Sequence, residues 1–300
     1  MGSEMTARRP SSDDRGGLGT GTRLTVLMTC HNRVDRTVAC LRSLSDQQDA
    51  SEHKLAVVLV DAGSTDGTRE TVRQHFPHVE VIERGPDLFW NGGMRVALSH
   101  AYESDPDLYL WMNDDVALDE DALATLIDCH RELEATRTAP AIVVGSTRDP
   151  DTGEHTYGGV MRPDRRRPMR YELVAPGDVP RQVETMNGNC VLVPRAVVAR
   201  IGNLAGAYTH GMGDYDYGHR ADRAGCEVWI APGTIGTCAR NPEAPRAASL
   251  DEHRRRVTSP TGGLPPSEWF TYVRRWGGPL WPVYAVSPYA RRFLGWAIAR

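Results

Sequence analysis

The stretch Leu108-Tyr-Leu-Trp-Met-Asn-Asp-Asp-Val116 joins a run of apolar residues to an amide and two adjacent carboxylates. An apolar run that is closed by turn-forming residues is typical of a buried strand whose carboxyl end opens into a loop. Ligands of open α/β sheets bind at that edge, and adjacent carboxylates there suit a hard divalent cation held against a phosphate. The alternative is that Asp114 and Asp115 are solvated loop residues before a helix that starts near Asp119.

Three earlier segments repeat the order of strand, polar loop and helix. The expected strands are Leu24–Met28, Leu55–Val60 and Val79–Ile82, and the helical patterns that follow them are Val34–Leu44, Thr68–His75 and Met94–Tyr102. Four such units in a row predict a mainly parallel, doubly wound α/β sheet. Because parallel strands end at one edge of a sheet, their loops should converge there. The loop residues concerned are Asn32, Asp61, Trp90, Asn91, Asp114 and Asp115.

The second half of the chain is less regular. A fifth strand is expected at Ala141–Gly145, and Arg148–Arg181 is expected to be mostly loop because it is rich in Pro, Gly and Arg. The tail from Ser267 interleaves aromatic residues with arginine. We expect this tail to pack against the catalytic domain, and a contact with an acceptor or a membrane surface is the alternative.

The composition bounds the class of protein. The 300 residues are 40% hydrophobic with a net charge of −4, which fits a soluble enzyme and gives no indication of nucleic-acid binding. The six cysteines show no CxxC spacing, so a reducing compartment is expected and not a zinc ribbon or a disulfide scaffold. No segment is apolar enough for a membrane span. We therefore expect a cytoplasmic protein that is at most attached to the inner face of the membrane. Neither GxGxxG after the first strand nor GxxxxGK[ST] occurs, which argues against dinucleotide and P-loop enzymes.

Five segments together resemble the family 2 glycosyltransferases, which are inverting enzymes of the GT-A fold that use nucleotide sugars. The segments are Val26-Leu-Met-Thr-Cys-His-Asn32, Leu59-Val-Asp-Ala-Gly-Ser-Thr-Asp-Gly67, Asn113-Asp-Asp-Val116, Asn187-Gly-Asn189 and Gly213-Asp-Tyr-Asp216 with Arg220. The resemblance implies a Rossmann-like GT-A fold, to which this chain adds a C-terminal aromatic and Arg-rich extension. The expected parts are a disordered leader (1–22), a nucleotide-sugar-binding half (23–145), an acceptor and catalytic half of the same domain (146–245) and the extension (246–300).

The resemblance assigns a nucleotide-base pocket to Thr29, Asn32 and Asp61. Asp61 can accept a hydrogen bond from the imide N–H of uracil or thymine, so uridine and thymidine diphosphate donors are favoured. His31 stands where many members have an aromatic residue, and it either stacks on the base or is structural. Arg33 is expected to reach a phosphate. Further donor contacts are expected from Trp90, Asn91, Arg95 and Asp114.

The resemblance also places a metal ligand. Asn113 and Asp115 occupy the ends of the family's DxD-type motif, and the amide of Asn113 replaces the first carboxylate. Asp115 is therefore the expected ligand of Mg²⁺ or Mn²⁺. Asp114 is expected to contact the ribose or to reach the metal through water.

The base of the reaction is expected to be Asp214, which matches the aspartate of the family's Glu-Asp motif, while Gly213 replaces the acidic neighbour. Asp216 lies two residues further on, and on a helix it would point to a different side. Asp216 is therefore assigned to capping or to acceptor positioning. Asn187, Gly188 and Asn189 are expected to line the donor sugar, and His210 the acceptor mouth.

The predicted function is transfer of a hexosyl or deoxyhexosyl group from a nucleotide sugar to an acceptor hydroxyl, with inversion. The sequence does not identify the acceptor, which is a glycan, a lipid-linked glycan or a small-molecule aglycone, nor the oligomeric state. A catalytically impaired homologue is the main alternative, because Asn113 and Gly213 depart from the commonest acidic pattern. A sugar-nucleotide pyrophosphorylase is less favoured, since Thr29–Arg33 is not the glycine-rich loop with Arg and Lys that such enzymes use.

Overall fold

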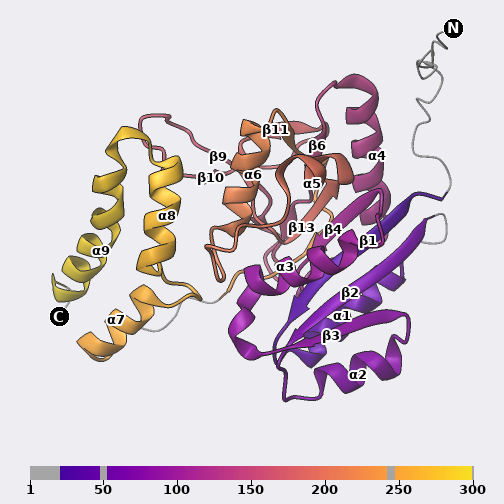
Figure 1. The fold of residues 1–300 in the computed structure, drawn as a ribbon, viewed down its shortest axis with the longest axis horizontal. Helices are drawn as coiled ribbons and strands as arrows, with labels where there is room; N and C mark the ends of the chain where they lie inside the picture. The colour runs from indigo at the N-terminus through magenta and orange to yellow at the C-terminus, as the bar shows by residue number, and fades with distance from the viewer. Residues whose placement is uncertain (1–20, 48–52, 242–246, 299–300) are drawn as a thin grey trace, which may run out of the picture.

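The computed structural model describes residues 21–47, 53–241 and 247–298, so most of the leader expected at residues 1–22 lies outside these ranges. A central sheet with helices on both faces forms the body, and a group of three helices follows at the C-terminal end (Figure 1). This group is called the C-terminal helices below, and it comprises α7 (Leu250–Thr258), α8 (Pro266–Trp276) and α9 (Trp281–Ile298), with the 3₁₀ turn η3 (Gly278–Leu280) before α9.

Eight strands form the central sheet, in the order β11-β14-β6-β13-β4-β1-β2-β3. Their bounds are β1 (Arg23–Cys30), β2 (Lys54–Ala62), β3 (Val79–Arg84), β4 (Leu108–Met112), β6 (Ala141–Val144), β11 (Arg181–Val183), β13 (Cys190–Pro194) and β14 (Glu227–Ile230). The four strands at one side, β4, β1, β2 and β3, are all parallel to one another. The predicted α/β fold with a mainly parallel sheet is therefore confirmed.

The expected fifth strand, β6, does not lie next to β4. Strand β13 runs between them and is antiparallel to both. Because Cys190 at the start of β13 pairs with Met112 at the end of β4, the residues just before β13 lie beside the carboxyl end of β4. This antiparallel insertion brings Asn187–Asn189 to Asn113–Asp115.

The helices of the body cover the two faces of the sheet. Their bounds are α1 (Val34–Ser45), α2 (Thr68–His75), α3 (Phe89–Tyr102) after the 3₁₀ turn η2 (Pro86–Leu88), α4 (Ala122–Thr136), α5 (Arg195–Ile201) and α6 (Gly213–Arg223). Side chains alternate along β1, so Val26 and Met28 pack with α1, α2 and α4 on one face. Leu27 packs with α3, α5 and α6 on the other face. Because both faces are covered, the strands are continuously apolar, which is the pattern seen in the sequence.

Helix α3 begins at Phe89, earlier than the predicted start near Met94. The glycines of this segment indicated a loop, but Gly93 lies inside the helix where it crosses β1. A Cβ atom on Gly93 would be 2.1 Å from Oγ1 of Thr29. The glycine therefore allows a close approach of helix and strand, and it does not mark a turn.

The stretch Arg148–Arg181, expected to be mostly loop, contributes short strands to two small sheets. One sheet has the order β10-β9-β12 and the other β5-β15-β7-β8. The bounds are β5 (Ala117–Leu118), β7 (Thr147–Arg148), β8 (His155–Tyr157), β9 (Gly159–Met161), β10 (Glu172–Leu173), β12 (Thr185–Met186) and β15 (Gly236–Thr237). Strands this short have too few residues to show a period in the sequence.

Helix α8 packs against the body through Tyr272 and Trp276, which form a small buried cluster with Tyr208. Helix α9 is held mainly by α8 and by the loop that precedes α8. The indole N–H of Trp269 donates to the carbonyl of Tyr284 at 2.9 Å, and the hydroxyl of Tyr289 donates to the carbonyl of Leu264 at 2.8 Å. No helix in residues 21–47, 53–241 or 247–298 is long and apolar enough to span a bilayer.

Candidate active site

A cavity of about 960 Å³ opens at the carboxyl ends of β1 and β4. Its size lies within the range of small-molecule and cofactor sites. It is lined by Thr29, Cys30, His31, Arg33, Ala62, Pro86, Phe89, Trp90, Asn113, Asp114, Asp115, Tyr157, Asn187, Gly188, Asn189, His210, Gly211, Asp214, Asn241, Thr261 and Gly262. Residues far apart in the sequence thus share one cavity, as the parallel strand order predicts.

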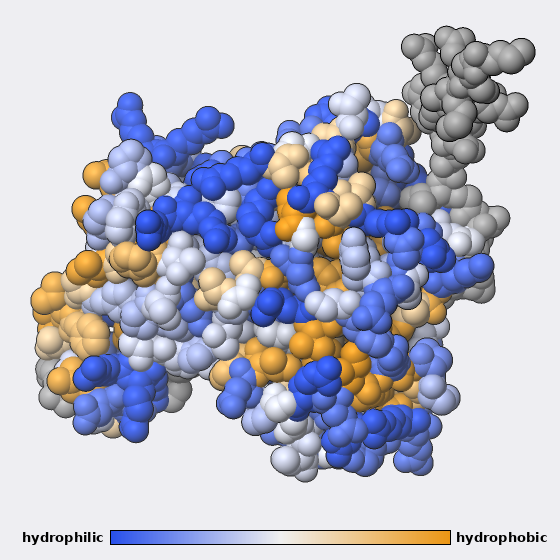
Figure 2. Space-filling view, viewed as in Figure 1, coloured by the Kyte–Doolittle hydropathy of each residue, from blue (hydrophilic) through white to orange (hydrophobic). Residues whose placement is uncertain are grey.

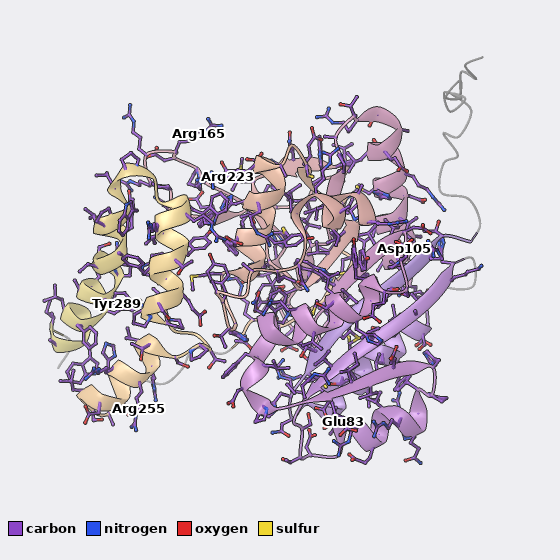
Figure 3. All side chains as sticks on the ribbon, viewed as in Figure 1. Glu83, Asp105, Arg165, Arg223, Arg255 and Tyr289 are labelled. Carbon is purple, nitrogen blue, oxygen red and sulfur yellow. The ribbon has the colours of Figure 1, made fainter. Side chains whose placement is uncertain are left out.

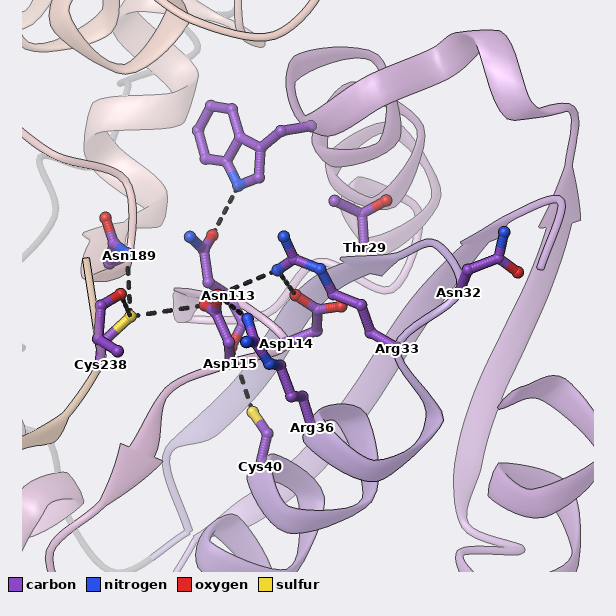
Figure 4. A network of polar contacts seen from close by, with 12 residues as sticks. Thr29, Asn32, Arg33, Arg36, Cys40, Asn113, Asp114, Asp115, Asn189 and Cys238 are labelled. Atoms are coloured by element: carbon purple, nitrogen blue, oxygen red, sulfur yellow. Dashed lines mark hydrogen bonds and ion pairs between the residues drawn. The ribbon is translucent and has the colours of Figure 1, made fainter. Parts of the chain in front are cut away.

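The acidic end of β4 is paired with Arg33 from the loop after β1 (Figure 4). One guanidinium nitrogen of Arg33 donates to Asp114 at 3.2 Å and to Asp115 at 3.0 Å. Arg36 lies 3.8 Å from the same oxygen of Asp115. The thiol of Cys238 donates to the other oxygen of Asp115 at 3.5 Å. Arginine side chains therefore supply the positive charge at these carboxylates.

The two carboxylates differ in their exposure. Asp114 is buried, and burial raises its pKa to about 6 although Arg33 favours the charged form. Its Oδ2 is buried with no hydrogen-bond partner among the described residues. Asp115 is partly exposed to the cavity.

These residues fit a divalent cation whose coordination is completed by the phosphates of a bound substrate. Among the residues that the structure describes, no three His, Cys, Asp or Glu side chains are grouped so that they could hold a metal. However, Mg²⁺ is usually bound through one or two carboxylates together with substrate phosphates, and not in an all-protein cage. Asp115 offers such a carboxylate to the cavity. A metal bound here would have to compete with Arg33 and Arg36.

The loops after β1 and β2 are fastened to each other. Nδ1 of His31 lies 2.7 Å from the carbonyl of Ala62, which fixes the imidazole at the cavity wall. Asn32 accepts a hydrogen bond from the backbone N–H of Thr65 at 2.7 Å and does not line the cavity. Asp61 is buried behind the wall, and its Oδ2 has no partner within the described part of the chain. The structure therefore gives Asn32 a role in joining the two loops.

Trp90 connects α3 to the end of β4. Its indole N–H donates to Oδ1 of Asn113 at 2.7 Å, so the amide that replaces the first carboxylate of the motif is held by this ring. Cζ2 and Cη2 of the same ring cover Gly188, where a Cβ atom would be 2.5 Å from these carbons. Gly188 is thus required by the close approach of Trp90.

Asp214 lies in the first turn of α6 and lines the cavity. One carboxylate oxygen accepts from the backbone N–H of Gly188 at 3.0 Å, and the other from that of Tyr215 at 2.9 Å. Burial raises the pKa of Asp214 to about 6, and the backbone N–H groups oppose this shift. A carboxylate with such a pKa is suited to accept a proton near neutral pH.

The glycine before Asp214 has a steric cause. A Cβ atom on Gly213 would lie 2.0 Å from Oδ1 of Asn91. Asn91 is fully buried and donates to the carbonyls of Ala205 and Tyr208 at 3.0 and 2.6 Å. An acidic residue at position 213 would displace this amide. Asn91, expected to contact the donor, is instead a buried support for the segment before α6.

The role expected for Asp216, capping or acceptor positioning, is not what the structure shows. Its carboxylate is fully buried and does not line the cavity. It accepts hydrogen bonds from Tyr208 at 3.2 Å, Arg220 at 2.9 Å, Arg275 at 2.6 Å and Trp276 at 3.0 Å. Since the last two belong to α8, Asp216 joins the helix of Asp214 to the C-terminal helices.

His210 lies at the cavity wall, with its Nδ1 3.5 Å from the backbone N–H of Trp90. Burial lowers its pKa. The preceding residue, Thr209, donates to the buried Glu268 of α8 through its backbone N–H at 3.0 Å and its hydroxyl at 2.5 Å. Helix α8 therefore holds this loop as well as α6.

Arg95 lies outside the cavity. Its Nε donates to the carbonyl of Leu204 at 3.1 Å, and the side chain lines a separate depression along α3. Conversely, the cavity includes residues that the sequence did not indicate, chiefly Tyr157, Asn241, Thr261 and Gly262. These come from irregular segments of the second half, in which no strand end or motif marks them.

A family model described as "Glycosyl transferase family 2" matches residues 25–202. The chain is 28% identical over 218 residues to "N-acetylglucosaminyl-diphospho-decaprenol L-rhamnosyltransferase" of two Mycobacterium tuberculosis strains, which covers 63% of this chain and 67% of the relative.

Two solved structures share the fold. One is "Mannosyltransferase PcManGT from Pyrobaculum calidifontis in complex with GDP-Man and Mn2+", with a TM-score of 0.53, 17% identity and coverage of 93% of this chain and 76% of that one. The other is "Crystal structure of GalNAc-T7 with UDP, GalNAc and Mn2+", with a TM-score of 0.58, 12% identity and coverage of 79% and 48%.

Proposed function

Because the chain belongs to glycosyl transferase family 2, and is a glycosyltransferase of the GT-A fold, we propose that it moves a sugar from a nucleoside diphosphate donor to an acceptor hydroxyl with inversion at the anomeric carbon. One observation carries this proposal. The segment Asn187–Asn189 is hydrogen-bonded both to the acidic end of β4 and to Asp214. Asn189 accepts from the N–H of Asn113 at 2.8 Å, and Gly188 donates to Asp214 at 3.0 Å. This segment fixes the position of the proposed base relative to the acidic strand end.

The nucleotide binds at the end of the cavity formed by Thr29, Cys30 and His31. Oδ2 of Asp61 lies buried behind this end of the cavity and has no partner in the described residues, so a base whose N–H donates to it would satisfy it once the wall opens on binding. Uracil and thymine have such an imide N–H, so uridine and thymidine diphosphate donors are preferred.

The diphosphate binds against the acidic end of β4. Arg33 pairs with both carboxylates, and its guanidinium would also bind a phosphate placed beside them. Asp115, with Asp114 behind it, would hold Mg²⁺ or Mn²⁺ beside the diphosphate. When bound, such an ion supplies charge stabilisation to the leaving diphosphate. Both related structures contain Mn²⁺, which supports this assignment.

Asp214 is the general base. It accepts the proton of the acceptor hydroxyl while that oxygen attacks the anomeric carbon, and the backbone N–H groups of Gly188 and Tyr215 orient the carboxylate for this step. Trp90 and Gly188 bound the space beside it, where the donor sugar would lie. His210 lies at the acceptor side.

The acceptor is a saccharide hydroxyl on a lipid-linked diphosphate, and the donor sugar is a deoxyhexose. The support is the similarity to the Mycobacterium tuberculosis N-acetylglucosaminyl-diphospho-decaprenol L-rhamnosyltransferase. The alternative of an impaired homologue loses its main argument at Gly213, because the packing against Asn91 accounts for the missing acidic residue.

The test compares Asp214→Asn and Asp115→Asn with the wild type. Donor binding is followed by thermal shift with UDP and dTDP, each with and without Mn²⁺, and transfer by release of the nucleotide in the presence of acceptor. We expect Asp214→Asn to bind the nucleotide normally and to lose transfer, and Asp115→Asn to lose the metal-dependent shift. Transfer by Asp214→Asn at the wild-type rate would refute the assignment of the base. A wild type that binds nucleotide but neither transfers nor hydrolyses a donor would establish the impaired homologue.

A further inference from the structure

The exposed apolar surface of this chain is concentrated on the C-terminal helices. Ten large hydrophobic side chains are exposed in the described part of the chain, and seven of them lie between Leu250 and Ile298. Figure 2 shows apolar residues along the outer edge of this helix group, at the left of the view. Isolated exposed hydrophobic residues are ordinary, whereas a contiguous set indicates an interaction surface.

Helix α9 carries most of this surface on one face. Val283, Val286 and Leu294 are 59%, 65% and 61% exposed, and Ala290 and Ala297 between and after them are exposed as well. These five residues recur at intervals of three or four, so they form a single stripe along the helix. We call it the α9 stripe. No residue of α9 is buried, so this stripe is not part of the core.

The aromatic residues of α9 lie on its other sides and fasten it to the C-terminal helices. Trp281 packs on Phe270 with ring centroids 5.1 Å apart, and Trp296 stacks on His253 at 5.5 Å. The backbone of Tyr284 and the hydroxyl of Tyr289 are hydrogen-bonded as described above. Because these contacts attach the other sides of α9 to the neighbouring helices, the α9 stripe faces outward.

The charge around the α9 stripe is positive. Residues 247–298 contain seven arginines and three carboxylates, a net charge of +4 in a chain whose total is −4. Arg291 and Arg292 are exposed on α9 itself, and Arg254 and Arg255 on α7. At the start of α9, the hydroxyl of Tyr284 donates to the carbonyl of Arg166, which brings the turn containing Arg165 beside the helix. Figure 3 shows Arg165 near one end of the helix group, Arg255 near the other, and Tyr289 on α9.

We propose that the α9 stripe and the arginines around it bind the surface of an anionic lipid bilayer. A helix with an apolar face and flanking arginines lies in the plane of a membrane interface, with the apolar side chains below the headgroups and the cations beside the lipid phosphates. A second copy of this chain fits the surface less well. A two-fold dimer through the α9 stripe would bring the exposed arginines of α7 and α9 in both copies close together, and like charges repel.

The position of these helices explains what such docking achieves. The loop between α7 and α8 contributes Thr261 and Gly262 to the wall of the cavity. The same helix group thus contacts both the bilayer and the reaction site. This deepens the proposed function and rests on it in one respect, because it gives a lipid-linked acceptor a defined side from which to reach Asp214.

The experiment measures cosedimentation with vesicles in the absence of donor and acceptor, so that its result does not depend on glycosyl transfer. The vesicles are phosphatidylcholine alone or an equal mixture with phosphatidylglycerol. The test variant is Val286→Glu with Leu294→Glu. The matched control is Val179→Glu, since Val179 is 66% exposed and lies outside the C-terminal helices. Hydrolysis of UDP- and dTDP-sugars in solution is measured for all three proteins, and size-exclusion chromatography with light scattering gives their mass.

We expect the wild type and Val179→Glu to bind the anionic vesicles more strongly than the neutral ones. The double variant should lose about tenfold or more in partitioning, because two apolar side chains would no longer enter the interface. Donor hydrolysis should be the same in all three proteins. Absence of vesicle binding by the wild type, or equal binding by the double variant, would overturn the proposal. So would a wild-type dimer that the double variant disrupts. Loss of donor hydrolysis in every protein, with vesicle binding intact, would count against the proposed function alone.

Discussion

Asp214 and Asp216 lie two residues apart in the first turn of α6. We predict that asparagine at position 216 lowers the stability of the fold, whereas asparagine at position 214 abolishes transfer and leaves the stability unchanged. Asp216→Asn removes the charge from a fully buried oxygen pair that accepts from Arg220 and Arg275. Breaking one side of a buried ion pair costs about 3 to 5 kcal/mol. The side chains of Arg220 and Arg275 are 21% and 35% exposed and regain part of their hydration. We therefore expect the lower end, about 3 kcal/mol.

Asp214→Asn should change stability little. The pKa of Asp214 is raised from 3.8 to about 6, so its charged form is disfavoured in the folded state. Replacing it with a neutral amide relieves roughly 3 kcal/mol near neutral pH. Against this, the amide can accept from only one of the two backbone N–H groups, and the loss costs about 1 to 3 kcal/mol. The two effects nearly cancel.

The assay is thermal unfolding of both variants beside the wild type, with turnover measured well below the melting temperatures. For a chain of this size, Asp216→Asn should lower the melting temperature by roughly 5 °C. Asp214→Asn should keep the wild-type melting temperature and lose transfer. If Asp216→Asn were as stable as the wild type, the buried network would not contribute as argued. If Asp214→Asn lost stability and activity in proportion, the carboxylate would be structural.

Three further predictions follow from the site. Asp214 must be deprotonated to act as a base, and its pKa is about 6. The value of kcat/KM should therefore fall tenfold per pH unit below about pH 6 and stay constant above it. A pH profile from 4 to 8 without this decrease at low pH would contradict the assignment of the base. Gly188→Ala places a Cβ atom 2.5 Å from the ring of Trp90, so it should cost roughly 1 to 3 kcal/mol of stability and reduce transfer, and a wild-type kcat in this variant would show that Trp90 moves freely. Glu268→Gln weakens the two hydrogen bonds from Thr209 and should raise the KM for the acceptor while the KM for the donor stays constant, as steady-state kinetics with each substrate varied would show.

The sequence was informative wherever structure depends on neighbouring residues. The strand, loop and helix order of residues 24–136 follows from the period of the apolar residues, and the acidic end of β4 follows from an apolar run that stops at Asn113. The expected gathering of loops at one edge also follows, since parallel strands must end on the same side. Trp90, Asp114 and Asp115 line the cavity on these grounds.

The sequence did not distinguish roles that depend on distant contacts. Asp214 and Asp216 point to different sides of α6, as the sequence indicated. Only the hydrogen bonds from Arg275 and Trp276 of α8, about sixty residues later in the chain, show that Asp216 belongs to a buried network while Asp214 faces the cavity. The same holds for Asn91, which the sequence placed beside the donor and the structure buries against the segment before α6.

The sequence by itself therefore determined the fold class, the family and the edge of the sheet at which the site lies, because these are recorded in local periodicity and in short motifs. Only the tertiary structure decided that β13 enters the sheet antiparallel to β4 and carries Asn187–Asn189 to the acidic strand end. It also decided that Gly213 is glycine because of Asn91, and that the α9 stripe faces outward. These outcomes depend on packing and burial between residues that are far apart in the chain, and no local pattern encodes them.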